Sequence, residues 1–342
     1  MPTKAGPFAK AIKAHQKAVR INPEDADAWY NLGVAYDNAG ETAKAIEAYQ
    51  QALRINPEHA KAWYNLGSAY DNAGETAKAI KAYQQALRIN PEYADAWYNL
   101  GVAYGNDGET AKAIEAYQQA LRINPEDADA WFNLGSAYGN DGETAKAIEA
   151  YQQALRINPE YAMAWNNLGS AYDDVGQFAK AIEAYQQALR INPEYADAWF
   201  SLGNAYDNDG ELAKAIEAYQ QALRINPKFA MAWYNLGVAY AKAGQFAKAI
   251  EAYQQAVRIN PEYADAWNNL GVAYGKAGQP AKAIEAYQQA VRINPEYAAV
   301  WNNLGNAYGR SGQRGKVVEV YKRLKTLDPV LAERFFSEVV MP

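Results

Sequence analysis

Tryptophan occurs in this chain at one fixed interval. The sequence contains nine tryptophans, and each lies 34 residues after the one before it, from Trp29 to Trp301. A period between about 20 and 50 residues is typical of repeat architectures, in which each copy packs only against its neighbours. The interval therefore predicts an extended array of similar repeats rather than an enzyme-like globule with one closed core.

The first full repeat, residues 26–59, contains two amphipathic-helix patterns joined by a glycine. The segment WYNLGVAY places apolar or small residues at i, i+3, i+4 and i+7, and AIEAYQQAL places them at i, i+1, i+4, i+7 and i+8. Gly40 lies between the two and suits a helix C′ position with positive φ. Asn56-Pro57-Glu58 then predicts a helix start with an N-cap, a first-turn proline and an acid. Each repeat is therefore expected to form an antiparallel helix hairpin.

Gly33 and its copies lie in the middle of the first helix of each repeat. A glycine there costs about 1 kcal/mol relative to alanine. We expect the compensation to be a close approach of helices, with tryptophan and tyrosine rings filling the space beside the glycine.

The recurring residues resemble the tetratricopeptide repeat (TPR) pattern. The residues that carry the resemblance in the first repeat are Trp29, Leu32, Gly33, Tyr36, Ala45, Tyr49, Ala52 and Pro57. The resemblance implies an all-α TPR solenoid of antiparallel helix hairpins, wound into a right-handed superhelix whose first helices line a concave groove.

The resemblance also sets the predicted domain organisation. We expect one solenoid domain over 1–342, with a partial repeat at 1–25 that holds a second helix only. A C-terminal capping helix is expected at 332–342. Nine repeats fill 26–331, starting at residues 26, 60, 94, 128, 162, 196, 230, 264 and 298.

Composition and charge exclude several classes of function. The net charge is −6 and the pI is about 5.2, so nucleic acid is an unfavourable partner. The chain has no apolar run of 18 residues and no apolar leader at its start, so neither membrane insertion nor secretion is expected and a cytoplasmic location is favoured. The chain contains no cysteine, which excludes disulfides and thiolate metal sites.

The copies differ mainly in the first helix. Counted from the first alanine of each repeat, positions 2, 5, 9, 12 and 13 carry most of the differences, whereas AKAIEAYQQALRINPE recurs unchanged in four second helices. In TPR proteins, positions 2, 5, 6, 9, 12 and 13 resemble the set that faces a ligand in the groove. The alternative is that these positions are exposed and drift freely, although the exposed side of the second helix hardly varies.

Position 6 is an asparagine in every repeat except one, where it is Ser201. An amide offers donors and an acceptor, so a row of amides can bind the backbone of an extended peptide. The row is similar to the asparagine ladder in the TPR superhelix of O-GlcNAc transferase. Alternatively, the asparagine was copied with the duplicating module or bonds a neighbouring repeat. The asparagines are Asn31, Asn65, Asn99, Asn133, Asn167, Asn235, Asn269 and Asn303.

Aromatic and acidic residues accompany this row. Position 5 carries rings such as Tyr30, Tyr64 and Tyr98, which could contact a ligand or pack between adjacent first helices. In repeats one to six, the charged residues at positions 2, 12 and 13 are aspartates apart from Lys61. In repeats seven to nine, the same positions carry Asp265 against three basic residues, Lys242, Lys276 and Arg310. This distribution favours a basic or neutral peptide in the acidic stretch. The position-2 acids chosen as site residues are Asp95, Asp129 and Asp197. No basic residue occupies position 6, which argues against a clamp for a partner's terminal carboxylate.

No motif for catalysis, phosphate binding or calcium binding is present. We therefore expect no enzyme activity and no cofactor. The favoured function is a scaffold that binds an extended peptide or a helix of a partner protein in the groove. One alternative is a structural solenoid without a cognate ligand, consensus-like or designed, which self-associates end to end. Another is the targeting region of a larger enzyme.

Overall fold

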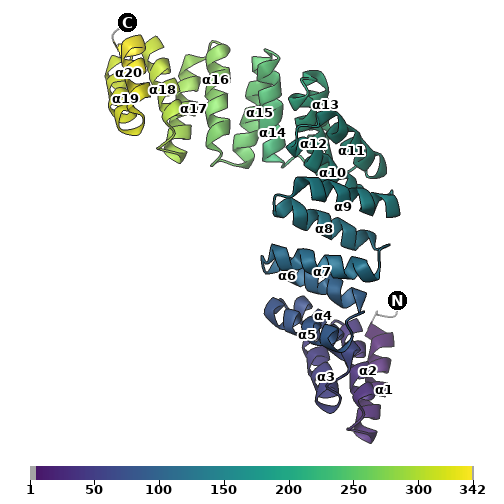
Figure 1. Ribbon diagram of the computed structural model, residues 1–342. Helices are drawn as coiled ribbons and strands as arrows, with labels where there is room; N and C mark the ends of the chain where they lie inside the picture. Colours follow the sequence, from purple (N-terminus) through teal and green to yellow (C-terminus); the bar gives the residue numbers. More distant parts are fainter. Residues whose placement is uncertain (1–4, 341–342) are drawn as a thin grey trace. The chain divides into compact units, whose positions relative to one another are not determined.

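The described part of the chain is entirely helical. The computed structural model describes residues 5–340, which form twenty α-helices and one π-helical turn with no strand among them (Figure 1). The all-α prediction is therefore confirmed. Residues 1–4 of the predicted partial repeat and residues 341–342 of the predicted capping helix lie outside the described range.

The helices alternate between two lengths. After α1 (Ala5–Ile21), nine first helices of 13 residues alternate with nine second helices of 14 residues. The first helices are α2 (Ala26–Asn38), α4 (Ala60–Asn72), α6 (Ala94–Asn106), α8 (Ala128–Asn140), α10 (Ala162–Asp174), α12 (Ala196–Asn208), α14 (Ala230–Lys242), α16 (Ala264–Lys276) and α18 (Ala298–Arg310). The second helices are α3 (Thr42–Ile55), α5 (Thr76–Ile89), α7 (Thr110–Ile123), α9 (Thr144–Ile157), α11 (Phe178–Ile191), α13 (Leu212–Ile225), α15 (Phe246–Ile259), α17 (Pro280–Ile293) and α19 (Arg314–Leu327). The chain ends with α20 (Pro329–Phe335) and the π-helical turn η1 (Phe336–Val340).

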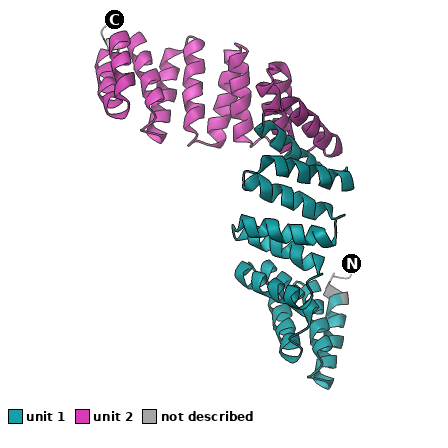
Figure 2. Ribbon diagram, viewed as in Figure 1, with its two compact units in different colours: residues 1–175 teal, residues 176–342 magenta. Residues whose placement is uncertain are grey.

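The helices form two compact units, unit 1 at Met1–Val175 and unit 2 at Gly176–Pro342 (Figure 2). Within each described unit, first helices of successive repeats contact each other, whereas no second helix contacts another second helix. The first helices therefore line the tighter side of each unit. We call the exposed side of these helices the first-helix face. The single domain over 1–342 stays a prediction.

Glycine forms the turn inside each hairpin. Gly40 has a φ of 74°, and its N–H donates to the Asp37 carbonyl at 2.9 Å while the Glu41 N–H donates to the Tyr36 carbonyl at 2.9 Å. These two bonds make a Schellman motif, which satisfies the last carbonyls of α2 and requires a left-handed residue that glycine adopts without strain. The predicted positive φ at Gly40 is confirmed.

The connection between repeats differs from the prediction. The predicted helix start at Asn56-Pro57 is wrong, because Asn56 is the C-cap of α3 and α4 begins at Ala60. The Asn56 side chain accepts a hydrogen bond from the Glu58 N–H at 3.1 Å, which stabilises a turn instead of capping a helix. The cap of α4 is His59, whose Nδ1 accepts from the Ala62 N–H at 3.3 Å.

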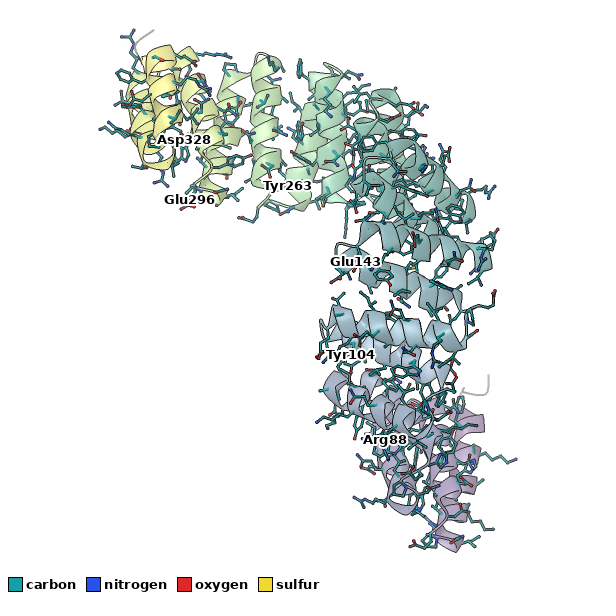
Figure 3. The ribbon with its side chains drawn as sticks, in the orientation of Figure 1. Arg88, Tyr104, Glu143, Tyr263, Glu296 and Asp328 are labelled. Atoms are coloured by element: carbon teal, nitrogen blue, oxygen red, sulfur yellow. The ribbon has the colours of Figure 1, made fainter. Side chains whose placement is uncertain are left out.

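A helix start of the predicted kind, with a capping side chain followed by proline, is found at α20. Asp328, labelled in Figure 3, accepts a hydrogen bond from the Leu331 N–H at 2.9 Å, and Pro329 is the first residue of α20. The terminal helix therefore begins three residues before the position expected for it.

Each tryptophan fastens a first helix to the turn that precedes it. The Trp63 ring is half-buried, and its Nε1–H donates to the Pro57 carbonyl at 2.8 Å. Equivalent bonds join the other eight tryptophans to the carbonyl of the proline six residues earlier, at 2.8 to 3.0 Å. The regular tryptophan interval thus reflects one fixed turn geometry between repeats.

In repeats one to four and six to eight, the helical glycine faces the ring of the second-helix tyrosine. A Cβ atom on Gly33 would lie 2.5 Å from two ring carbons of Tyr49, which is fully buried. Tyrosine therefore fills the space as predicted, whereas the tryptophan has the turn contact described above. In the last repeat, Phe335 of α20 and Val320 of α19 occupy this space beside Gly305.

Candidate functional site

The predicted site residues lie on the first helices. Asn31 is exposed and the other position-6 asparagines are half-buried; Tyr30, Tyr64 and Tyr98 are half-buried too. Asp95, Asp129 and Asp197 are exposed near the N-terminal ends of α6, α8 and α12. The structure places all of these on helices that run next to one another within each unit, so one extended ligand could contact several of them.

The asparagines join neighbouring repeats. Asn65 Nδ2 donates to the Tyr30 hydroxyl at 3.2 Å, and Asn99 Nδ2 donates to the Tyr64 hydroxyl at 3.0 Å. The same bond recurs from Asn133 to Tyr98 at 2.9 Å and from Asn269 to Tyr234 at 3.1 Å. One of the alternatives for this row, a bond to the adjacent repeat, is therefore present. Each such bond uses one of the two amide hydrogens.

Two asparagines make the same link to an amide instead of a tyrosine. Asn303 Nδ2 donates to Asn268 Oδ1 at 3.0 Å, and Asn235 Nδ2 donates to Asn204 Oδ1 at 2.8 Å. The hydrogen bond between repeats is therefore kept where the preceding repeat has no tyrosine at position 5, which is Asn268 in repeat eight and Phe200 in repeat six.

The aromatic residues at position 5 pack between two other rings, except Tyr98, which has one ring partner, Tyr117. The Tyr64 ring centroid lies 5.9 Å from that of Tyr83 in the same hairpin and 4.8 Å from that of Tyr93, the residue just before α6. These separations are those of favourable tilted ring pairs. Packing between repeats, which was the alternative for these rings, is therefore present.

Sequence reasoning missed a ring contact between repeats. It is made by the residue just before the first helix in five of the repeats. Its rings stack on position 5 of the preceding repeat, as Tyr263, labelled in Figure 3, does on Tyr234 at 4.9 Å. The available signal was an aromatic residue at this position in most repeats. The ring pairs of this kind involve His59, Tyr93, Tyr161, Phe229 and Tyr263.

Buried tyrosines of the second helices also reach the first-helix face through their hydroxyls. Tyr83 donates to an Asp71 carboxylate oxygen at 2.8 Å, and Tyr219 donates to Asn204 Oδ1 at 2.8 Å. Burial raises the pKa of Asp71, and the Tyr83 hydrogen bond partly opposes that rise. Sequence reasoning assigned these tyrosines to the core alone, because their apolar spacing gives no sign of where the hydroxyl ends.

Several acidic groups of the face have partners inside the protein. In unit 2, Lys242 Nζ lies 2.7 Å from an Asp207 carboxylate oxygen, and the Tyr297 hydroxyl donates to Asp265 at 2.7 Å. In unit 1, His59 Nε2 lies 3.3 Å from Asp27 Oδ1. The change from acidic to basic residues after repeat six therefore includes at least one direct neutralising pair.

The tyrosine stacks predict a loss of stability at high pH. Burial raises the pKa of Tyr93 and of Tyr263 from 10.0 to about 12, with smaller contributions from neighbouring tyrosines and aspartates. The folded state therefore holds these protons more tightly than the unfolded chain, so the associated stability is complete below pH 10 and is lost between pH 10 and 12. Urea unfolding followed by circular dichroism should give constant midpoints from pH 7 to 9 and falling midpoints above pH 10. Midpoints that stay constant to pH 12 would contradict this expectation.

Neither a metal-binding cluster nor a membrane-spanning helix is present among the described residues. None of their His, Asp and Glu side chains form a group of three or more that could hold a metal ion. No helix in the described range combines the length and apolar character needed to cross a membrane.

Two family models match the chain. The model described as Cilia and flagella-associated protein 70 C-terminal domain matches residues 2–156 and 162–329. The model described as Tetratricopeptide repeat matches residues 126–194. No curated protein sequence matches the chain.

Solved structures of helical-repeat proteins resemble the chain. The Cut9–Hcn1 hetero-tetramer of APC/C matches with a TM-score of 0.53 and 21% identity, covering 86% of this chain and 58% of that chain, and supports the fold. MamA matches with a TM-score of 0.47 and 33% identity, covering 48% of this chain and 97% of its own. YrrB, described as a TPR protein with an unusual peptide-binding site, matches with a TM-score of 0.49 and 26% identity over 55% of this chain and 96% of its own.

Proposed function

Because this chain belongs to the tetratricopeptide repeat family, we propose that it is a non-catalytic scaffold that binds an extended segment or a helix of a partner protein on its first-helix face. The observation that carries the proposal is the row of position-6 asparagines, held in place by bonds such as Asn99 to Tyr64. A polar group that its neighbours already orient loses less conformational entropy when it binds. The row can therefore present one amide group to a peptide backbone in every repeat except the sixth, which has Ser201.

The charge of the face supports a basic or neutral partner segment. Asp95, Asp129 and Asp197 are exposed on three first helices of repeats one to six. Such charges act mainly on the rate of association and on the choice of partner. A ligand with positive charge opposite these repeats is thus favoured over an acidic one.

Removing three asparagines of the row should weaken peptide binding. We expect the triple variant Asn65→Ala, Asn99→Ala, Asn133→Ala to bind a peptide selected on the wild-type chain at least about tenfold more weakly, because each lost hydrogen bond contributes about 0.5–1.5 kcal/mol. Isothermal titration calorimetry measures the change. Circular dichroism before each titration shows whether the variant remains folded.

The matched control removes the same number of amides from the second helices. The triple variant Gln51→Ala, Gln85→Ala, Gln119→Ala should bind the peptide as the wild-type chain does, since these half-buried side chains lie on α3, α5 and α7. If the asparagine variant bound the peptide as tightly as the wild-type chain does, the position-6 asparagines would not be the groups that bind it.

End-to-end self-association is a second candidate, favoured by the surface of α1. This helix matches the second helices in sequence, but Ala14 is exposed where its counterpart Ala48 is buried. Ala18 is likewise half-buried where Ala52 is fully buried. Another first helix could cover this face of α1. Light scattering over a hundredfold concentration range tests the idea, and a constant monomer mass would refute it.

A further inference from the structure

A polar hollow lies on the first-helix face of unit 1. It has a volume of about 310 Å³ and is lined by residues of α8, α9 and α10, among them Ser136, Tyr151, Asn167 and Asp174. Gly139 contributes to its wall, and a Cβ atom there would have no neighbour within 4 Å. The volume is at the lower end of those found for small-ligand pockets, which suits one side chain better than a larger molecule.

The side chains around the hollow are arranged to accept hydrogen bonds. The Tyr151 hydroxyl donates to Ser136 Oγ at 3.2 Å, and Ser136 Oγ donates to the Phe132 carbonyl at 3.1 Å. A hydroxyl has one hydrogen and two acceptor positions, so both hydroxyls have committed their hydrogen within the protein. Serine therefore still has an acceptor position for a ligand that donates.

The hollow is also a favourable place for positive charge. Among the described residues that line it, Asp174 is the only charged one. Asn140 and Asp174 are the last residues of α8 and α10, so two helix C-termini, which carry partial negative charge, end at its wall. No lysine or arginine of residues 5–340 lines it to neutralise this charge.

We propose that this hollow binds the side-chain ammonium of a lysine in the partner segment. The inference rests on the proposed function, because the lysine is carried by a peptide on the first-helix face. An ammonium is a compact charge with three donors, which matches one carboxylate and separate neutral oxygens around a small volume. A guanidinium is a planar fork that fits two parallel acceptors better.

A random twelve-residue peptide display library, selected on the full wild-type chain, tests the inference. We expect the enriched peptides to share a lysine at one position and to lose that preference when Asp174→Asn is the target. The variant Asp107→Asn removes the same charge from the end of α6, outside the hollow, and should keep the preference.

Affinity measurements make the test quantitative. For the best selected peptide, we expect acetylation of its lysine to weaken binding at least about tenfold by fluorescence anisotropy, since the acetyl group removes the charge. Gly139→Leu, which places a side chain in the hollow, should weaken binding by a similar factor. Gly105→Leu makes the same change in α6, at a glycine that also has no neighbour within 4 Å of a Cβ, and should have little effect.

The outcomes separate this inference from the proposed function. Enriched peptides without a shared lysine, or with a lysine preference that Asp174→Asn leaves intact, would overturn the lysine site while the peptide-binding function stands. If no peptide is enriched on the wild-type chain, the proposed function fails and the inference fails with it.

Discussion

Replacing Gly101 by alanine is expected to lower the free energy of unfolding by about 1–3 kcal/mol, although alanine is the better helix former. The added Cβ would lie 2.7 Å from Cε1 and 2.8 Å from Cδ1 of Tyr117, whose ring is buried between α6 and α7. Either the ring or the helix backbone must therefore shift to accommodate the added methyl group. Urea unfolding followed by circular dichroism measures the change.

A second glycine in the same helix provides the control. Gly105 is also in α6, but a Cβ there would have no neighbour within 4 Å. Gly105→Ala should therefore stabilise the chain by a few tenths to about 1 kcal/mol, because only the helix propensity changes. If both alanine variants were stabilised, the close approach of Gly101 to Tyr117 would not be what requires glycine.

Truncation of Phe335 to alanine is expected to loosen α20 from the last hairpin, formed by α18 and α19. The Phe335 side chain is almost fully buried against Gly305, and loss of a buried phenylalanine side chain costs about 3–5 kcal/mol. In a solenoid each repeat contacts only its neighbours, so the loss should remain local. Hydrogen exchange should become faster in α18 and α19 and stay unchanged in α2 to α5.

The control for this variant is a neighbouring exposed residue. Val330 lies on the same short helix and is 83% exposed, so Val330→Ala should leave exchange in α18 and α19 as it is in the wild-type chain. Faster exchange throughout the chain after Phe335→Ala would contradict nearest-neighbour energetics.

The helix hairpins and their packing could be predicted because they depend on residues close in sequence. The spacing from Trp29 to Tyr36 and the glycine at residue 40 define the first helix and its end, and the structure has both. The start of the next helix could not be predicted from Asn56-Pro57. The same kind of pair, Asp328-Pro329, does start α20, so the local motif permits both conformations.

The candidate site was predicted less completely than the fold. The periodicity placed the asparagines and aromatic residues on the first helices, but it gave no partner for them. The bond from Asn65 to Tyr30 depends on how two repeats pack side by side. The position of the Tyr83 hydroxyl beside Asp71 depends instead on how α4 and α5 pack within one hairpin. Such contacts are set by the angle between helices, which single-sequence patterns do not specify.

The bond between Asn133 and Tyr98 spans 35 residues, one repeat and one residue more. Excision of residues 94–127 would bring Asn133 next to Tyr64, which is an identical partner 34 residues earlier. Gain or loss of a whole repeat therefore preserves the bonding register at the new junction. A gene that encodes this chain can change the length of the first-helix face by duplication or deletion in steps of 34 codons, without having to create a new interface between repeats.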